Sequence, residues 1–310
     1  MKLNQNEKLI YNKFSGTLLG LAIGDALGAA VEFKPRGTFK KVTGMRGGGP
    51  HNLEPGYWTD DTSMALCLAE SLIEQSFNLE LQLDKYVKWY QEGYLSSTGS
   101  CFDIGINTAN SLTNYAKTGE LPPEKERAAG NGSLMRLAPI PMYYRNSFKK
   151  AVKYSGESSL ATHNNIMAVD ACRFAGGLIQ RLINSSNKSE AYKLTAIKAT
   201  TEELSLDSRV AGAITGALEK ESDEQIKSDG FVINSLEASL WSFINSSSFK
   251  EATLKAVNLG HDADTVGAIT GQIAGAFYGQ RDIPEDWIQQ LALKETIFDI
   301  IDKLFEESRA

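Results

Sequence analysis

The chain has 310 residues, of which 42% are hydrophobic and 23% charged, a composition typical of a globular protein with a large core. Its net charge of −6 and the lack of a long basic run argue against nonspecific binding to nucleic acid. The three cysteines lie far apart without a Cys-x-x-Cys pair, which argues against a disulfide framework or a zinc site.

The first predicted helix contains an apolar run, TLLGLAIGDALGAAV over residues 17–31, which follows several lysines. Such a run resembles the core of a signal peptide, but Asp25 interrupts it. We find no apolar stretch long and clean enough to cross a membrane, so we expect a cytoplasmic protein without membrane contact. The segment also carries glycine at every fourth position: Gly16, Gly20, Gly24 and Gly28.

Helical spacing of apolar residues continues through the chain, over 64–73, 87–94, 236–243 and 297–304. None of the 8 prolines lies between Pro141 and Pro284, and proline breaks the interior of a helix. Alternating β-branched residues, which mark strands, are scarce. These patterns predict an essentially all-α fold, in one domain over 1–310 because no shift of composition marks a linker. Clusters of Gly, Pro, Ser and Thr predict loops at 34–58, 95–101 and 118–132.

A second glycine series lies near the C-terminal end of the chain, at Gly267, Gly271, Gly275 and Gly279. Residues four apart share one helix face, and each glycine costs roughly 1 kcal/mol relative to alanine in a helix interior. Two such faces imply a compensating contact, so we predict that the two glycine-bearing helices pack together at the centre. The sequence GAITG occurs at 212–216 and at 267–271, which we interpret as shared packing chemistry rather than a repeat.

Two clusters of acids and hydroxyls stand directly before predicted helices: Thr59, Asp60 and Asp61, and Asp262, Asp264 and Thr265. Thr and Asp commonly cap helices, because their oxygens accept hydrogen bonds from free backbone N–H groups. For either cluster alone, capping is the simpler interpretation. Three consecutive acids or hydroxyls exceed the needs of one cap, however, and the second cluster precedes a helix that we expect at the centre.

Four carboxylates that meet in the interior are very costly unless a cation neutralises them. The ligands on offer are all oxygens, which favours Mg²⁺ or Mn²⁺ over zinc or copper. Six oxygen-bearing side chains suffice for two ions roughly 3.5–4 Å apart. The sequence therefore predicts a two-metal site, provided that the fold brings the two clusters together.

Six ordered blocks cover nearly the whole chain: GTLLGLAIGDALGAAVEF (16–33), YWTDDTSMAL (57–66), STGSCFDIG (97–105), GNGSLMRLAPI (130–140), ATHNNIMAVDACR (161–173) and GHDADTVGAITGQIAGA (260–276). In this order they resemble the ADP-ribosylglycohydrolase family. The resemblance implies a compact, single-domain orthogonal helical bundle whose central cleft holds two Mg²⁺ or Mn²⁺ ions. It implies as metal ligands Thr59, Asp60, Asp61, Asp262, Asp264 and Thr265.

The same resemblance implies residues that act on ADP-ribose. Glu32 matches an acid that reaches toward the metals and gates the cleft, and Asp103 matches a residue near the bond that breaks. The loop GNGSLMR matches one that cradles ADP-ribose, where small residues let backbone N–H groups reach a diphosphate. Phe231 departs from the tyrosine expected in many relatives, and so lacks a hydroxyl. The implied substrate contacts are Thr98, Gly99, Phe102, Gly130, Asn131, Gly132, Ser133, Met135, His163 and Phe231.

Several residues also have a structural interpretation. His163 is either a helix-start residue or a ligand contact, and the resemblance favours the contact. Arg136 is either a core salt-bridge partner or a phosphate contact. Trp58 and Phe102 either stack on adenine or pack in the core. We interpret Asp25 as a residue that orients metal ligands or caps a loop, rather than as a ligand itself.

These assignments predict hydrolysis of the N-glycosidic bond between ADP-ribose and an arginine of a modified protein, with ADP-ribose as product. The metals position the ribose and polarise a water, while Asp60 or Asp61 moves a proton and Asp103 assists. Competing hypotheses are action on serine-linked ADP-ribose, poly(ADP-ribose) or O-acetyl-ADP-ribose, a catalytically silent ADP-ribose-binding protein, and a two-metal phosphohydrolase. We expect a monomer.

Overall fold

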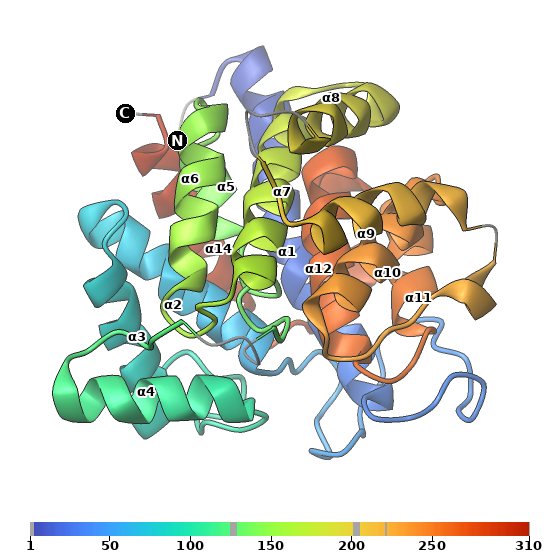
Figure 1. Ribbon diagram of the computed structural model, residues 1–310. Coiled ribbons are helices and arrows are strands. Elements are labelled where there is room, and N and C mark those ends of the chain that lie inside the picture. The colour runs from blue at the N-terminus through green and yellow to red at the C-terminus, as the bar shows by residue number, and fades with distance from the viewer. Residues whose placement is uncertain (1–2, 125–128, 201–204, 221, 310) are drawn as a thin grey trace.

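The computed structural model describes residues 3–124, 129–200, 205–220 and 222–309, and within them the chain is helical without a β-strand (Figure 1). The all-α prediction is confirmed. The α-helices are α1 (Gln5–Gly28), α2 (Asp60–Gln75), α3 (Leu79–Glu92), α4 (Ile106–Thr118), α5 (Pro139–Tyr143), α6 (Phe148–Ser159), α7 (Ile166–Asn184), α8 (Lys188–Thr200), α9 (Ser208–Glu219), α10 (Val232–Ile244), α11 (Phe249–Val257), α12 (Ala263–Tyr278), α13 (Glu285–Gln290) and α14 (Lys294–Glu307). Short 3-10 helices occupy Ala29–Val31, Asp223–Gln225 and Gln280–Asp282.

The predicted loops are also confirmed where the structure describes them. Residues 34–58, 95–101, 119–124 and 129–132 contain no helix, whereas Thr118 is still the last residue of a helix and 125–128 lie outside the described residues. The loop at 34–58 is long, and it joins the end of α1 to the start of α2.

The centre of the fold is an antiparallel pair formed by α1 and α12, held at backbone distance by glycine. A Cβ added at Gly20 would lie 2.2 Å from the carbonyl oxygen of Gly271, and one at Gly24 would lie 2.0 Å from that of Gly267. These separations leave no room for any side chain. The predicted contact between the two glycine faces is confirmed, and it sets the register that positions the site.

The copy of GAITG at 212–216 packs differently from the copy in α12. In α9, a Cβ added at Gly212 would meet nothing within 4 Å, and one at Gly216 would meet only the Glu237 side chain. The interpretation of shared packing chemistry was therefore wrong. The glycines of this sequence approach a backbone in α12 but at most a side chain in α9, because tertiary neighbours rather than local sequence decide the use of each glycine.

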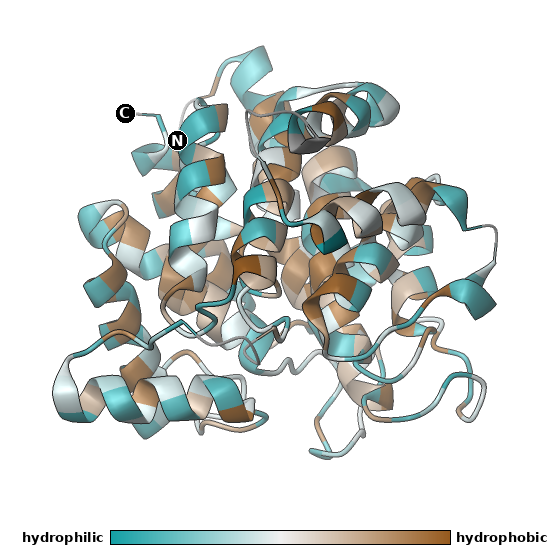
Figure 2. Ribbon diagram, viewed as in Figure 1, coloured by the Kyte–Doolittle hydropathy of each residue, from teal (hydrophilic) through white to brown (hydrophobic). Residues whose placement is uncertain are grey.

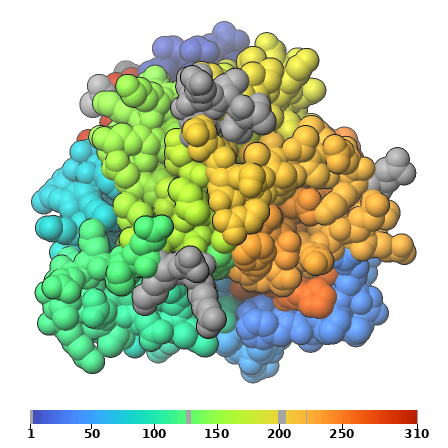
Figure 3. All heavy atoms as spheres, viewed as in Figure 1, coloured from blue at the N-terminus to red at the C-terminus, as the bar shows by residue number. Residues whose placement is uncertain are grey.

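The apolar character of α1 follows from its central place. The helix Gln5–Val31 is long and apolar enough for a membrane span, so the expectation that no such stretch exists was wrong. The most apolar 18 residues of this helix are all buried within the protein. Figure 2 shows apolar residues concentrated along the central helices, whereas α3 and α4 alternate between hydrophilic and hydrophobic. In Figure 3 the side chains of α6, α7 and α9 cover this face of the central pair.

Antiparallel packing brings the end of α1 to the start of α12. A Cβ at Gly28 would lie 2.3 Å from the carbonyl oxygen of Ala263. Beyond α1, the backbone N–H of Phe33 donates to His261 O (2.7 Å), and that of His261 donates to Lys34 O (2.8 Å). The chain after α1 is thus joined to the chain before α12, which places Glu32 beside the second acidic cluster.

Candidate active site

The two acidic clusters occupy helix starts, but their side chains do not cap those helices. Thr59 is the N-cap of α2 and Asp262 is the N-cap of α12, and neither makes a side-chain capping bond. The oxygens of both residues face other elements instead. This observation favours the functional interpretation of the clusters over simple capping.

Asp25, which lies in α1, caps the start of α2 in place of Thr59. Its carboxylate accepts hydrogen bonds from the backbone N–H groups of Thr59 (2.9 Å) and Thr62 (3.1 Å) and from both hydroxyls, at 3.0 and 2.6 Å. Burial raises the pKa of Asp25 to about 6, although these bonds favour its charged form. Asp25 thus holds Thr59 and Thr62 in place, and its carboxylate also lies within 4.8 Å of ligand oxygens of Asp61 and Asp264. That Asp25 orients ligands rather than acting as one stays a prediction.

The clusters meet despite their separation along the chain. Thr59 Oγ1 lies 3.3 Å from Asp264 Oδ2, and Thr265 Oγ1 lies 3.4 Å from Asp61 Oδ1. Asp60 and Asp262 line the same cavity. The condition on which the predicted metal site depended is therefore fulfilled.

The electrostatics of the cluster call for a cation. Burial, reinforced by neighbouring carboxylates, raises the pKa of Asp60, Asp61 and Asp264 well above the usual range. Asp61 Oδ2 and Asp264 Oδ1 are buried and have no hydrogen-bond partner among the described residues. Buried charges of this kind are normally paired or coordinate a metal, and an all-oxygen set suits a hard divalent ion. The residues present thus fit a metal site.

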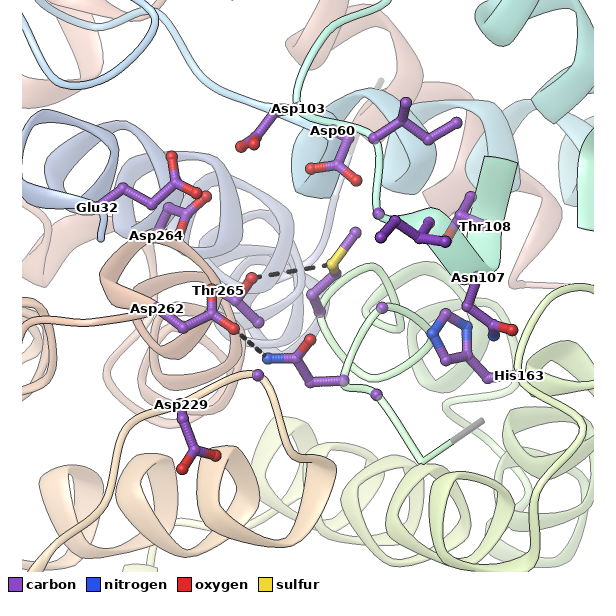
Figure 4. Close-up of a pocket in the computed structure, with 18 of the residues that line it drawn as sticks. Glu32, Asp60, Asp103, Asn107, Thr108, His163, Asp229, Asp262, Asp264 and Thr265 are labelled. Carbon is purple, nitrogen blue, oxygen red and sulfur yellow. Dashed lines mark hydrogen bonds between the residues drawn. The ribbon is translucent and has the colours of Figure 1, made fainter. Parts of the chain in front are cut away.

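A cavity of about 810 Å³ opens above the cluster. Figure 4 shows Glu32, Asp262, Asp264 and Thr265 on one side of it, Asp60 and Asp103 next to them, and Asn107, Thr108 and His163 opposite. One wall carries metal-type oxygens, and the other carries neutral polar groups. A ligand that fills the cavity therefore meets both chemistries at once.

The glycine-rich loop at 130–136 forms part of the wall and is tied to the acids. Asn131 Nδ2 donates to Asp262 Oδ2 (2.7 Å) and to Ser235 Oγ (2.9 Å). Gly130 forms an isolated β-bridge with Phe231. Asn131 therefore holds one oxygen of Asp262 and fixes the loop relative to the start of α12.

His163 lies beneath this loop and faces the cavity. A Cβ at Gly132 would lie 2.7 Å from its imidazole, so only glycine fits there. Burial, together with the charge of Arg136, lowers the pKa of His163 to about 3, which keeps the ring neutral. Its Nδ1 lies 2.8 Å from Thr162 Oγ1, and α7 begins beyond it at Ile166 with Asn165 as N-cap. His163 is thus not a helix-start residue.

Burial decides the roles of Arg136 and Trp58. Arg136 is fully buried, donates to Thr162 Oγ1 (2.7 Å) and lies over the Tyr86 ring, so it is a core residue. Trp58 is also fully buried and donates to the carbonyl oxygen of Ala292 (3.3 Å), so it packs rather than stacking on a ligand.

Not every predicted substrate residue lines the cavity. Glu32, Asp103, Gly130, Asn131, Gly132, Met135 and His163 do. Ser133 is buried and accepts a hydrogen bond from Ser159. Thr98 and Gly99 lie on an exposed turn, and Phe102 packs on His51 with ring centroids 5.1 Å apart. Thr98, Gly99, Phe102, Ser133 and Phe231 are not among the residues that line the cavity, and all the substrate contacts assigned from the sequence stay predictions.

The structure also brings in residues that the sequence did not single out. Asn107 and Thr108, in the first turn of α4, and Asp229, before α10, line the cavity. His51 contacts Asp103 from a loop beside it. Asn107 and Thr108 closely follow the block STGSCFDIG, which is the one signal that pointed toward them.

Comparison with known proteins agrees with this arrangement. The model of the ADP-ribosylglycohydrolase family matches residues 6–310. The chain belongs to the ADP-ribosylglycohydrolase family. An ADP-ribosylarginine hydrolase of Serratia proteamaculans is 41% identical over 95% of this chain and 79% of its own length. An ADP-ribosyl-dinitrogen-reductase glycohydrolase of Rhodospirillum rubrum is 29% identical over 92% of both chains.

A solved structure supports membership of this family at the level of the fold. It is described as an ADP-ribosylglycohydrolase-related protein complex and superposes with a TM-score of 0.85 at 38% identity, covering 97% of this chain and 99% of its own. The resemblance that the sequence blocks indicated is confirmed, as is the fold that it implied.

Proposed function

We propose that this protein hydrolyses the N-glycosidic bond between ADP-ribose and an arginine side chain of a modified protein, and so reverses mono-ADP-ribosylation. Two relatives at 41% and 39% identity, from Serratia proteamaculans and Pseudomonas putida, are named as ADP-ribosylarginine hydrolases. The observation that carries the proposal is the meeting of the two acidic clusters below one cavity. Such a site holds a polyhydroxylated sugar by its oxygens and leaves the rest of the cavity to the nucleotide.

The cofactor that we propose is a pair of Mg²⁺ or Mn²⁺ ions held by Thr59, Asp60, Asp61, Asp262, Asp264 and Thr265. When bound, such ions supply positive charge and Lewis-acid chemistry at the reacting sugar and its water. The unpartnered oxygens of Asp61 and Asp264 and the raised pKa of the carboxyls support this assignment. Asn131 donates a hydrogen bond to Asp262 Oδ2 and so holds it in place.

Acid–base chemistry requires a carboxyl group that reaches the substrate. Asp60 and Asp103 line the cavity, whereas Asp61 is fully buried and does not. We therefore assign proton transfer to Asp60, with Asp103 near the bond that breaks and Asp61 as a ligand. Burial and the charge of Asp103 raise the pKa of Glu32 to about 9, which leaves Glu32 a neutral acid that closes the cavity edge.

The remaining groups of the cavity bind and orient. His163, neutral because of its burial, presents an uncharged edge to a ligand. Gly130 and Gly132 line the cavity beside it, and such small residues let backbone N–H groups reach a diphosphate. Asn107 and Thr108 add neutral polar contacts on the same wall. These features favour an ADP-ribosyl group over a simple sugar.

The test is incubation with an arginine-ADP-ribosylated protein and Mg²⁺ or Mn²⁺, with and without chelator. We expect release of free ADP-ribose that stops when the metal is removed. A panel of serine-linked ADP-ribose, poly(ADP-ribose) and O-acetyl-ADP-ribose measures linkage preference. ADP-ribose binding without turnover, or phosphate release from nucleotides, would contradict the proposal. Monomeric state and cytoplasmic location stay predictions.

A further inference from the structure

His51 is a polar residue of the site to which the proposed reaction gives no part. It lies in the loop after α1, where Gly48 and Leu53 are paired through backbone hydrogen bonds of 2.8 and 2.9 Å. Gly49 in this loop has φ +74, and a Cβ there would lie 2.0 Å from the carbonyl oxygen of Ala29. The loop is therefore docked on the end of α1 and carries His51 to a fixed place.

That place is between two acids. His51 Nε2 lies 3.0 Å from Asp103 Oδ1 and 3.7 Å from Glu32 Oε2. The side chains of Asp103 and Glu32 are only 11% and 3% exposed. Phe102 packs against the imidazole, with ring centroids 5.1 Å apart. Glu32 and Asp103 also share a side-chain hydrogen bond, so the imidazole adds a second contact to the Asp103 carboxylate.

The orientation and charge of the Asp103 carboxylate depend on neighbours such as His51. Its backbone has φ 58, in the left-handed region that few residues other than glycine adopt, and it lies on a loop rather than on a helix. Burial works against its charge, whereas His51 favours the charged form. The direction of its carboxylate into the cavity is thus set by contacts from outside its own segment.

We propose that His51 is a positioning residue, which holds the Asp103 carboxylate toward the cavity. This inference rests on the proposed function, because it assigns Asp103 to the reacting bond. His51 itself touches no part of the metal cluster. Its removal is therefore expected to misplace one group and to leave substrate binding and the metal ligands intact.

The kinetic test compares three variants with the metal-loaded wild type. His51→Leu removes the nitrogen, His51→Gln retains a side-chain N–H donor, and Asn52→Gly alters an exposed neighbour while tolerating its φ of 52. We expect His51→Leu to lower kcat roughly 10- to 100-fold with little change in KM, as for a misplaced catalytic group. His51→Gln should recover most of kcat, and Asn52→Gly should match the wild type.

A spectroscopic arm separates this inference from the proposed function. The chain has 3 histidines, so the imidazole ¹⁵N signals of His51 are readily assigned. Asp103→Asn should shift them, even in a protein that releases no ADP-ribose from any substrate. Unchanged His51 signals would overturn the inference, as would a full kcat in His51→Leu or an equal loss in His51→Gln and Asn52→Gly.

Discussion

Helix starts in this protein fall into two kinds that look alike in sequence. Ser147 before α6 and Ser248 before α11 use their side chains to accept a backbone N–H of their own helix. Thr59 and Asp262 occupy the same position before α2 and α12, yet their side chains bond to residues of other elements. A polar group that its own helix does not use is available for chemistry. The distinction is therefore one of where an oxygen points, and residue type alone does not reveal it.

The largest effect on activity should come from removing an acid in the first turn of α2 or α12, where the two clusters meet. Asp264→Ala and Asp60→Ala each delete a carboxylate that the proposed metal centre needs, a contribution of several kcal/mol to the transition state. We expect ADP-ribose release to fall by at least about 10³-fold. Steady-state assays on arginine-ADP-ribosylated protein measure this, with Ser248→Ala as the matched control that retains activity. Normal turnover in either Asp variant would contradict the proposed metal centre.

The next largest effect concerns stability and the two copies of GAITG. Gly271→Ala would force a Cβ to within 1.9 Å of the Gly20 carbonyl oxygen, so we expect a loss of about 3 kcal/mol or more in the free energy of unfolding. Gly212→Ala meets open space in a helix and should stabilise by up to about 1 kcal/mol. Urea unfolding of both variants decides the matter. Equal effects would show that the contact between α1 and α12 is less tight than described.

Metal binding and pH should both change the stability of the protein through the same cluster of carboxyl groups. The folded-state pKa of Glu32 is raised from 4.5 to about 9, so its neutral form favours folding below pH 4.5 and that contribution is lost as pH rises through about 9. The other raised carboxyls act in the same direction. We expect the Tm of the metal-free protein to fall between pH 5 and 9. Saturating Mg²⁺ or Mn²⁺ should add about 2–3 kcal/mol near neutral pH, at roughly 100 times Kd.

Thermal scans with and without chelator measure that difference. Asp264→Ala serves as the control, because it should weaken the response to metal. A Tm of the chelated protein that rises steadily with pH would contradict the direction derived from the raised pKa of Glu32.

The smallest effect should come from an ordinary cap. Ser248→Ala removes the side chain that accepts the backbone N–H of Glu251 (3.1 Å), and we expect a loss of about 1 kcal/mol in unfolding free energy. ADP-ribose release should stay at the wild-type level. Thr59→Ala is the informative partner, because it should lower activity more than stability. The reverse ranking would place Thr59 among the ordinary caps.

Much of this architecture was accessible from the sequence because its signals are periodic. Gly16 to Gly28 and Gly267 to Gly275 repeat at the helical period, so their contact was predictable. The acidic clusters stand at helix starts with more oxygens than a cap uses, which indicated a cation site. In both cases a local pattern required a contact elsewhere in the fold. The two glycine series contact each other, and so do the two acidic clusters.

The rest depended on non-local geometry. His51 reaches Asp103 only because the loop at 48–53 docks on the end of α1, and no spacing in the sequence encodes that contact. The two copies of GAITG differ only in what packs against them. The hydropathy of α1 was underestimated, because its fully buried part, residues 14–28, carries the same composition as a membrane span.

The pairing of α1 with α12 has a consequence for biosynthesis. Thr59 and Asp264 are 205 residues apart, and at ribosomal rates of about 5–20 residues per second roughly 10 to 40 s pass between their synthesis. During that interval α1, which is long and apolar enough to cross a membrane, has emerged while the helix that covers its glycine face does not yet exist. Nascent chains should therefore need protection by chaperones until α12 arrives, and truncation before residue 263 should leave a product that aggregates.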